Sequence, residues 1–181
     1  INDTYNADIP ASVDNIRWYA EIIDKVYDDI APTPNNFIGM ITKEPIGVVG
    51  AIVPWNYPLW MAIWKIGPAL ITGNSVILKP AEQSPMSAIK IGELFSEAGL
   101  PDGVFNVLNG DKEIVNMILN SDEISSISFV GSTPVAKYIY ETSAKNGKRV
   151  QALGGAKNHL VVMPDANLNQ AVDGIMGAAY G

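Results

Sequence analysis

The chain has 181 residues, of which 48% are hydrophobic and 17% are charged, and its formal net charge is -7. This length suffices for one domain with a substantial core, and the composition is that of a soluble globular protein. The negative charge argues against a nucleic-acid partner, and no apolar run reaches the ~18 residues of a membrane span.

The sequence has no cysteine and a single histidine. Disulfides and thiolate metal sites are therefore excluded within it, and no metal site is expected. The first residues, Ile-Asn-Asp-Thr-Tyr, are not those of a signal peptide, so we expect a cytoplasmic location.

The first predicted element is an amphipathic helix from about Ala11 to Asp29. Its apolar residues recur at helical spacing on one face: Val13, Ile16, Tyr19, Ala20, Ile23, Val26 and Tyr27. Phe37 to Thr42 then alternates as a strand does, and an ordinary edge strand is one interpretation of it.

A strand-helix-strand unit follows. The apolar run 48–53 predicts a strand, and Pro58 begins a predicted helix that ends at Ile71 before Thr-Gly-Asn. Residues 75–78 predict the second strand. Such a crossover builds a parallel sheet with helices on its faces.

Strands and helices alternate along the rest of the chain. Further strands are predicted at 104–108, 124–130, 148–153 and 159–163, and helices at 85–98, 111–119, 134–144 and 168–179. The fold class is therefore α/β, an open doubly wound, mainly parallel sheet with helices on both faces. We expect about five strands in it, near 48–53, 75–78, 104–108, 124–130 and 159–163, with the first helix packed across the sheet.

Ligands of such sheets bind at the carboxyl ends of the strands, where Trp55, Asn56, Lys79 and Glu82 lie. The sequence has no Gly-x-Gly-x-x-Gly fingerprint. Gly131-Ser132-Thr133, between a strand and a helix, could instead hold a pyrophosphate, although a serine there is more often a plain N-cap. A weak surface ion pair is the simpler interpretation of Lys79 and Glu82.

Several linked motifs resemble those of the NAD(P)-dependent aldehyde dehydrogenases. They are Pro-Trp-Asn-Tyr-Pro at 54–58, Leu-Lys-Pro-Ala-Glu-Gln-Ser-Pro at 78–85, Ala98 to Val107, Ser128 to Thr133, and Leu-Gly-Gly at 153–155. Residues 1–105 look most like aminoaldehyde dehydrogenases, such as those for γ-glutamyl-aminobutyraldehyde and betaine aldehyde. Residues 106–181 look like methylmalonate-semialdehyde dehydrogenases.

The resemblance implies a Rossmann-like NAD-binding domain over 1–181, with an N-terminal helix and edge strand in 1–43 and the core in 44–181. The segment around Phe37 to Thr42 would then project and serve oligomer contacts, so a homo-oligomer is expected. The resemblance assigns the cofactor to Val53, Pro54, Trp55, Lys79, Glu82, Gly110, Gly131, Ser132, Val135, Leu153 and Gly154. A carboxylate at Glu82 would favour NAD over NADP, because it repels a 2′-phosphate.

The family oxidises an aldehyde through a cysteine thiohemiacetal, with hydride transfer to NAD. The resemblance makes Asn56 the oxyanion donor and Lys65 a further catalytic residue. It places Tyr57, Met61 and Trp64 in the substrate tunnel, while core packing is the other interpretation of that stripe. Lys65 lies within an otherwise apolar helix face and needs a partner.

Two departures from the family pattern stand out. The family's general base is a glutamate directly before Leu-Gly-Gly, and this position is Ala152 here. One branch that lacks this glutamate transfers its acyl group to coenzyme A, which is therefore a possible acceptor. The family's nucleophilic cysteine is also missing from these residues. The expectation is a fragment without its catalytic domain and without turnover of its own; the alternative is a catalytically inactive dinucleotide-binding or structural module.

Overall fold

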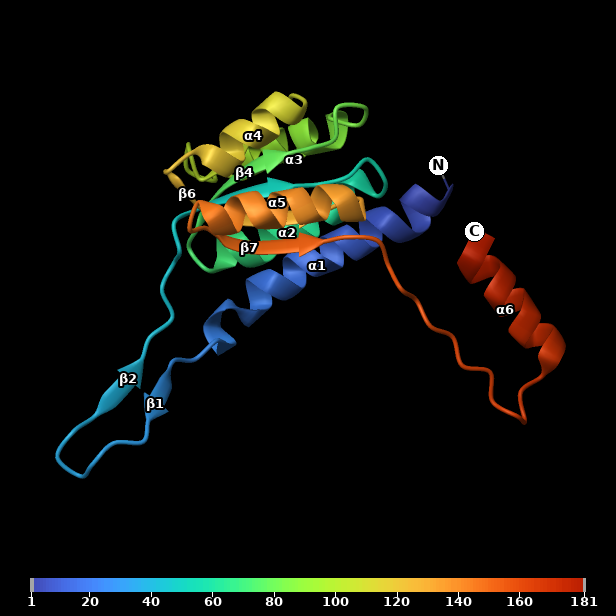
Figure 1. Ribbon diagram of the computed structural model, residues 1–181, viewed down its shortest axis with the longest axis horizontal. Coiled ribbons are helices and arrows are strands. Elements are labelled where there is room, and N and C mark those ends of the chain that lie inside the picture. Colours follow the sequence, from blue (N-terminus) through green and yellow to red (C-terminus); the bar gives the residue numbers. More distant parts are fainter. Residues whose placement is uncertain (1, 181) are drawn as a thin grey trace.

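The computed structural model describes residues 2–180, and its centre is a five-stranded sheet (Figure 1). The strands are Val48–Ile52 (β3), Ser75–Lys79 (β4), Phe105–Val107 (β5), Ile124–Val130 (β6) and Arg149–Leu153 (β7). They lie in the order β5-β4-β3-β6-β7, and all neighbours run parallel. The predicted doubly wound parallel sheet is confirmed.

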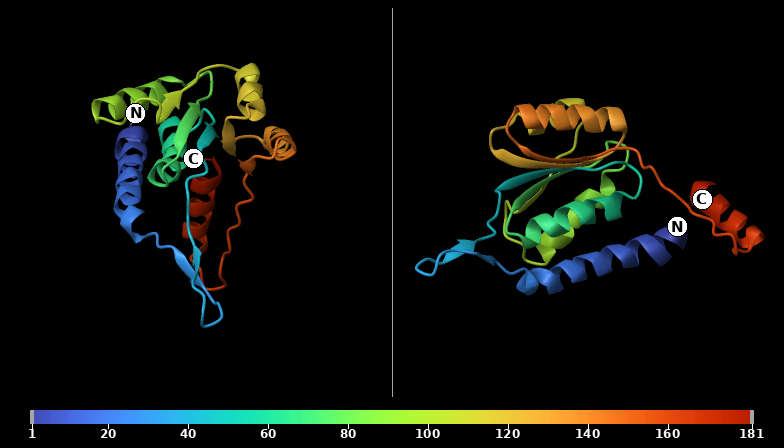
Figure 2. Two further views of the ribbon diagram at one scale, coloured as in Figure 1. Left: turned by 90° about the vertical axis from the view of Figure 1, so that its left-hand side faces the viewer. Right: turned by 60° about the horizontal axis from the view of Figure 1, so that its bottom comes forward.

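Helices cover both faces of the sheet. They are Pro58–Ile71 (α2), Met86–Glu97 (α3), Lys112–Asn120 (α4) and Thr133–Lys145 (α5). One apolar cluster, which includes Ile66 and Leu78, joins β3 and β4 to α2 and α3, and another, which includes Ile127 and Ile139, joins β6 to α4 and α5. In the right-hand view of Figure 2, α5 lies on one side of the sheet and α2 on the other. The helix after β3 (α2) and the helix after β6 (α5) therefore cover opposite faces of the sheet. In sheets of this kind, ligands bind at the carboxyl ends of the strands where the helices change sides.

The bounds of α2 agree with the prediction and follow from its sequence. Pro58 occupies the first turn, where no intrahelical partner awaits its missing N–H. After Thr72, Gly73 adopts φ +78°, which glycine does without a steric penalty, and the chain turns into β4. The other core helices and strands agree with the predicted bounds to within two residues. Among the helices of residues 2–180, none is both long and apolar enough to cross a membrane.

The N-terminal helix is shorter than predicted. A π-helical turn at Thr4–Asp8 leads into Ile9–Ile22 (α1), and a single 3-10 turn then ends at Lys25. The prediction of helix to Asp29 is wrong because Val26 turns to an extended backbone, φ -94° and ψ 93°. The expectation that this helix packs across the sheet is also wrong, since α1 packs on the outer side of α2 (Figure 2).

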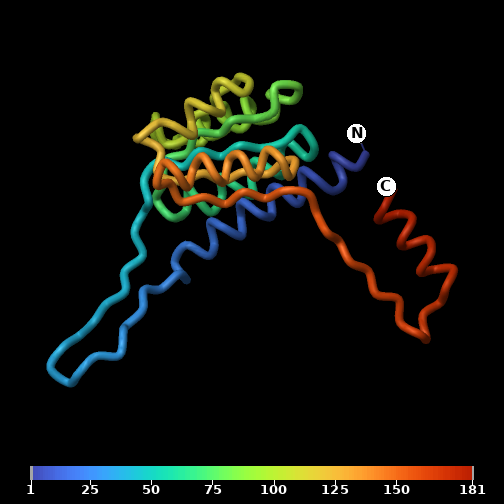
Figure 3. Tube along the Cα trace, viewed as in Figure 1, coloured from blue at the N-terminus to red at the C-terminus, as the bar shows by residue number. Residues whose placement is uncertain are grey.

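Asp29–Ala31 (β1) and Gly39–Ile41 (β2) form a separate antiparallel ribbon. The ribbon projects from the core at the start of the central strand (Figures 1 and 3). Lys43 fixes its base, since its ammonium contacts the Tyr27 carbonyl and lies 3.4 Å from the Asp29 carboxylate. The strand predicted at 37–42 is therefore not an edge strand of the main sheet.

The predicted fifth strand at 159–163 is also wrong. The chain leaves the sheet after Leu153, and residues 160–163 are exposed and have no strand partner within residues 2–180. The fifth strand is instead β7, which pairs with β6 from Arg149 to Leu153. The last helix, Leu168–Tyr180 (α6), lies apart from the sheet (Figure 3). Strand pairing with β6, rather than apolar content, therefore decides which segment joins the sheet.

Candidate functional site

The predicted site residues gather at the carboxyl edge of the sheet. Ile52 at the end of β3 is opposite Lys79 at the end of β4, and the Val53 N–H donates to the Lys79 carbonyl at 3.1 Å. On the other side of β3, Phe129 of β6 pairs with Ile52, and Ala152 and Leu153 of β7 lie beside the end of β6. The backbone thus brings four strand ends to one edge.

Lys79 and Glu82 form an ion pair in which only one partner meets solvent. The Lys79 ammonium donates to Glu82 Oε1 at 2.8 Å, and their side chains are 5% and 55% exposed. This hydrogen bond lowers the pKa of the Glu82 carboxyl below its usual value. Because Lys79 is buried, the pair differs from the surface ion pair considered from the sequence. It holds a carboxylate at the carboxyl edge of the sheet, with one oxygen bound to a buried cation.

The N-terminus of α5 is the second part of the edge. Ser132 is the N-cap of this helix, yet its side chain makes no capping hydrogen bond. The Gly131 N–H donates to the Leu153 carbonyl at 3.1 Å and extends the β6–β7 ladder by one residue. Val135, in the first helical turn, is exposed. An exposed hydroxyl and the positive end of a helix dipole can bind an anionic group here.

The loop after β7 comes close to this helix start. A β-carbon on Gly154 would lie 3.0 Å from Thr133 Oγ1 and 3.1 Å from its Cα, so a side chain at 154 would press on the backbone. The Gly155 N–H donates to Thr133 Oγ1 at 2.9 Å. Gly154 therefore permits the approach that the hydrogen bond then fixes.

Position 110, between β5 and α4, requires glycine because of its backbone angle and the closeness of α4. Its φ is +151°, and a β-carbon would lie 2.2 Å from Ile114 Cγ1 of α4. Asp111 caps α4 by accepting from the Glu113 N–H at 2.9 Å. The turn geometry explains this glycine, while its contact with a cofactor stays a prediction.

The Pro-Trp-Asn-Tyr-Pro turn presents its side chains at the same edge. Trp55 and Asn56 are exposed, and Pro54 is half-buried. Within residues 2–180 the Asn56 side chain has no hydrogen-bond partner, so both N–H groups of its amide can serve a ligand. Tyr57, the N-cap of α2, has φ +50°, the one positive φ among non-glycine residues in the described part of the chain.

The residues of the predicted tunnel stripe do not share one environment. Tyr57 and Trp64 are exposed, Met61 packs against the apolar cluster under α2, and Lys65 is buried. The left-handed backbone at Tyr57 places this residue outside the helix, so regular helical spacing does not apply to it. Trp60, which the sequence did not single out, connects the two exposed rings at centroid distances of 6.0 Å and 5.3 Å.

Lys65 reaches across the sheet to a partner that the sequence did not identify. Its ammonium donates to Gln151 Oε1 of β7 at 2.9 Å, and the Ser128 hydroxyl of β6 donates to the same oxygen at 2.9 Å. Burial lowers the pKa of Lys65. The one available signal was the strand alternation that puts Ser128 and Gln151 opposite each other in the β6–β7 register.

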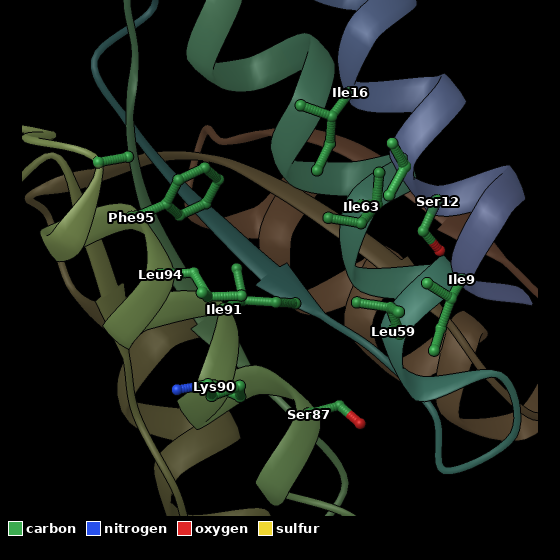
Figure 4. Close-up of a pocket in the computed structure, with 12 residues that line it drawn as sticks. Ile9, Ser12, Ile16, Leu59, Ile63, Ser87, Lys90, Ile91, Leu94 and Phe95 are labelled. Carbon is green, nitrogen blue, oxygen red and sulfur yellow. The ribbon is translucent and has the colours of Figure 1, made fainter. Parts of the chain in front are cut away.

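An apolar cavity of about 530 Å³ lies elsewhere, between α1, α2 and α3 (Figure 4). Ile16, Ile63 and Phe95 line it, and Lys90 at its rim is the one charged residue of the lining. It contains none of the predicted site residues. The polar groups that can do chemistry are at the strand ends.

Comparisons with known proteins show which family the chain resembles. The model of the aldehyde dehydrogenase family matches residues 1–181. A malonate-semialdehyde dehydrogenase of Pseudomonas aeruginosa is 58% identical over 138 residues, which are 76% of this chain and 28% of that protein.

The solved structures that resemble this chain are also aldehyde dehydrogenases. The NAD+ complex of an aldehyde dehydrogenase from Bacillus cereus has a TM-score of 0.93 and 39% identity, covering 99% of this chain and 37% of that one. The γ-glutamyl-γ-aminobutyraldehyde dehydrogenase of Burkholderia cenocepacia has a TM-score of 0.80 and 47% identity, covering 82% and 30%. The chain thus spans well under half the length of the proteins it matches.

Proposed function

The chain belongs to the aldehyde dehydrogenase family, and we propose that it is the NAD-binding part of an enzyme that oxidises a semialdehyde. The observation that carries this proposal is the meeting of the Lys79–Glu82 pair, the α5 N-terminus and the Pro-Trp-Asn-Tyr-Pro turn at one sheet edge. The names of the relatives, malonate-semialdehyde dehydrogenases, support a substrate that carries a carboxylate beside its aldehyde.

The chemistry of the residues at this edge supports NAD as the ligand. Glu82 can accept hydrogen bonds from ribose hydroxyls, with its second oxygen free of Lys79. Ser132 and the α5 N-terminus would bind the pyrophosphate, and Trp55, Val53 and Pro54 would contribute further contacts to the cofactor. Val135, Leu153, Gly154 and Gly110 would form the walls, and Gly154 has no side chain to obstruct an approaching ring. The family relative whose structure is an NAD+ complex supports the same cofactor.

A cysteine thiolate, which these 181 residues do not contain, would first add to the aldehyde carbon and leave its oxygen negatively charged. Bound NAD would supply the acceptor for the hydride that this carbon then releases as the thioester forms. The chain's own contribution is then to bind and orient. Asn56 would donate its side-chain amide to the substrate oxygen as negative charge develops there, and Lys65 would add a fixed positive charge. Tyr57, Met61 and Trp64 would line the approach of the aldehyde.

The product depends on what attacks the acyl group. Ala152 packs with the apolar cluster of α4 and α5, so its position offers no carboxylate to activate water. This supports coenzyme A as the acyl acceptor and an acyl-CoA as the product. An acid would require a base from elsewhere in the protein.

The ribbon supports assembly into a homo-oligomer. Ile30, Phe37, Ile38 and Met40 of β1, β2 and their turn are all at least 69% exposed. Two open strand edges carrying apolar side chains can pair with another copy of the chain.

Cofactor titration tests the proposal. Trp55 is 61% exposed at the site and Trp18 is 54% exposed on α1, away from it. NAD should quench the tryptophan fluorescence of the 181-residue chain, Trp55→Phe should remove that change, and Trp18→Phe should keep it. Calorimetry on the same proteins measures affinity directly. No heat and no quenching with millimolar NAD would refute an NAD site and favour a structural module.

A further inference from the structure

Three side chains from three elements meet at one oxygen atom. Gln151 Oε1 of β7 accepts from the Lys65 ammonium of α2 and from the Ser128 hydroxyl of β6, both at 2.9 Å. Lys65 is only 7% exposed, and its neighbours on α2 include the buried Ile63 and Ile66. A lysine in such surroundings requires an acceptor, and Gln151 supplies it.

The chemistry of the donors fixes the orientation of the amide. A lysine ammonium can only donate, so Gln151 must turn its oxygen rather than its NH2 group toward Lys65. The Ser128 hydroxyl then donates to the second lone pair of the same oxygen. Both acceptor positions of Oε1 are used, and the NH2 group points away from Lys65. Ser128 thus holds Gln151 in the orientation that Lys65 needs.

The amide is neutral, which has an electrostatic consequence. Within residues 2–180, none of the ion pairs includes Lys65. Burial lowers the pKa of Lys65, and no carboxylate of residues 2–180 forms an ion pair with its ammonium. The Gln151 oxygen is therefore the dipole that stabilises the charged amine, and it does so without neutralising the charge.

We propose that Gln151 is a positioning residue that Ser128 orients and that keeps Lys65 protonated and fixed between α2 and β7. This rests on the proposed function, in which Lys65 supplies positive charge to the reaction. Gln151 is two residues before Leu153 on the same strand, so the charge is held close to the proposed cofactor wall. Ala152 faces the opposite cluster, because neighbours on a strand alternate, so Gln151 does not replace a base at that position.

The experiment follows the Lys65 amine by NMR in the 181-residue chain with isotope-labelled lysine. Lys65→Arg identifies the signal by removing it. Gln151→Leu should raise the acid dissociation constant of Lys65 about tenfold, because a charged group loses its acceptor. Gln151→Glu should lower that constant by a similar factor. Ser128→Ala should shift it in the direction of Gln151→Leu but less.

Matched controls are available. Gln170→Leu lies on α6, away from the sheet, and Ser126→Ala changes the residue on the same face of β6 one pair earlier. Neither should move the Lys65 titration. If Gln151→Leu folds, as circular dichroism reports, and leaves the Lys65 titration unchanged, the proposal is wrong.

Two further measurements keep the test decisive. In the unsubstituted chain, the Gln151 side-chain amide signal should shift at the pH where Lys65 titrates, and an unchanged signal would overturn the proposal even if Gln151→Leu does not fold. NAD titration of the same samples separates the two ideas. If the chain binds no NAD but the Lys65 titration responds to Gln151→Leu, the positioning role of Gln151 is supported and the proposed NAD-binding function is refuted. If the chain binds NAD but the Lys65 titration does not respond, the proposed function is supported and the positioning role is refuted.

Discussion

Tyr19 of α1 packs so closely on Gly67 of α2 that a β-carbon at Gly67 would lie 2.5 Å from Tyr19 Cδ2. Real β-carbons do not approach this closely, so even alanine cannot occupy the position without moving the ring or the helix. Gly67 is itself buried. The contact therefore sets the distance at which α1 can cover α2.

Gly67→Ala should destabilise the chain by about 1–3 kcal/mol, because overpacking outweighs the gain in helix propensity. Gly92→Ala is the matched control, since Gly92 also lies inside a helix but its β-carbon would have ordinary contacts of 3.6 Å or more. That variant should be neutral or up to about 1 kcal/mol more stable. Urea unfolding of both variants decides between packing and propensity. Equal effects would contradict the close α1–α2 contact.

Asn74 joins the end of α2 to the start of β3 through all of its side-chain atoms. Its oxygen accepts from the Ile46 N–H at 2.7 Å and the Gly47 N–H at 3.1 Å, and its NH2 group donates to Ala69 and Thr72. Asn74→Ala should therefore cost about 2–4 kcal/mol of unfolding free energy. Asn106→Ala, which removes one exposed hydrogen bond to Gly103, should cost less than about 1 kcal/mol. Chemical denaturation with a tryptophan signal measures both values, and similar losses would argue against the Asn74 network.

The sequence predicted the sheet core well because local signals suffice there. Pro58 and Gly73 mark the two ends of α2, and the alternation of strands with helices determines a parallel sheet. Local signals could not decide between two candidate edge strands. Residues 159–163 are the more apolar of the two, yet 149–153 has the pairing with β6, and pairing depends on residues distant in sequence.

The candidate site shows the same division. Residues at or just after a strand end, such as Lys79 and Ser132, could be placed because the carboxyl ends of parallel strands share an edge. Partners within the site could not. Gln151 lies 86 residues from Lys65, and no local pattern links a strand glutamine to a helix lysine so far away. The N-terminal helical segment likewise ends at Lys25, and the β1–β2 pairing that follows it joins residues that are distant in sequence.

The Lys79–Glu82 pair predicts how stability depends on pH. The pKa of Glu82 is lowered in the folded chain, so its contribution is present above the usual glutamate pKa of about 4.3 and is lost as the pH falls through the lowered value. Because Glu82 is half exposed, we expect less than about 1 kcal/mol. Urea midpoints between pH 2 and 6, in roughly the range where carboxylates titrate, should fall more steeply for the original chain than for Glu82→Gln. Glu123→Gln, an exposed control, should follow the original chain.

The choice between NAD and NADP should depend on Glu82. Its carboxylate is held at the strand ends by a buried lysine, so it cannot move away from a ligand without breaking a 2.8 Å hydrogen bond. Ribose hydroxyls can donate to this carboxylate, whereas a 2′-phosphate would meet its negative charge. Such like-charge contact costs on the order of one to several kcal/mol. The original chain should therefore bind NAD more tightly than NADP.

Glu82→Ser should narrow this preference, chiefly by improving NADP binding, because Lys79 then loses its carboxylate and becomes available to the phosphate. Glu93→Ser is the matched control, since Lys90 and Glu93 form an ion pair of the same spacing and the same 2.8 Å distance on the exposed side of α3. It should leave both affinities unchanged. Calorimetric titration of the two cofactors against the three proteins gives the ratio of NAD affinity to NADP affinity directly. A ratio near one for the original chain, or one that Glu82→Ser and Glu93→Ser alter equally, would remove Glu82 from the cofactor site.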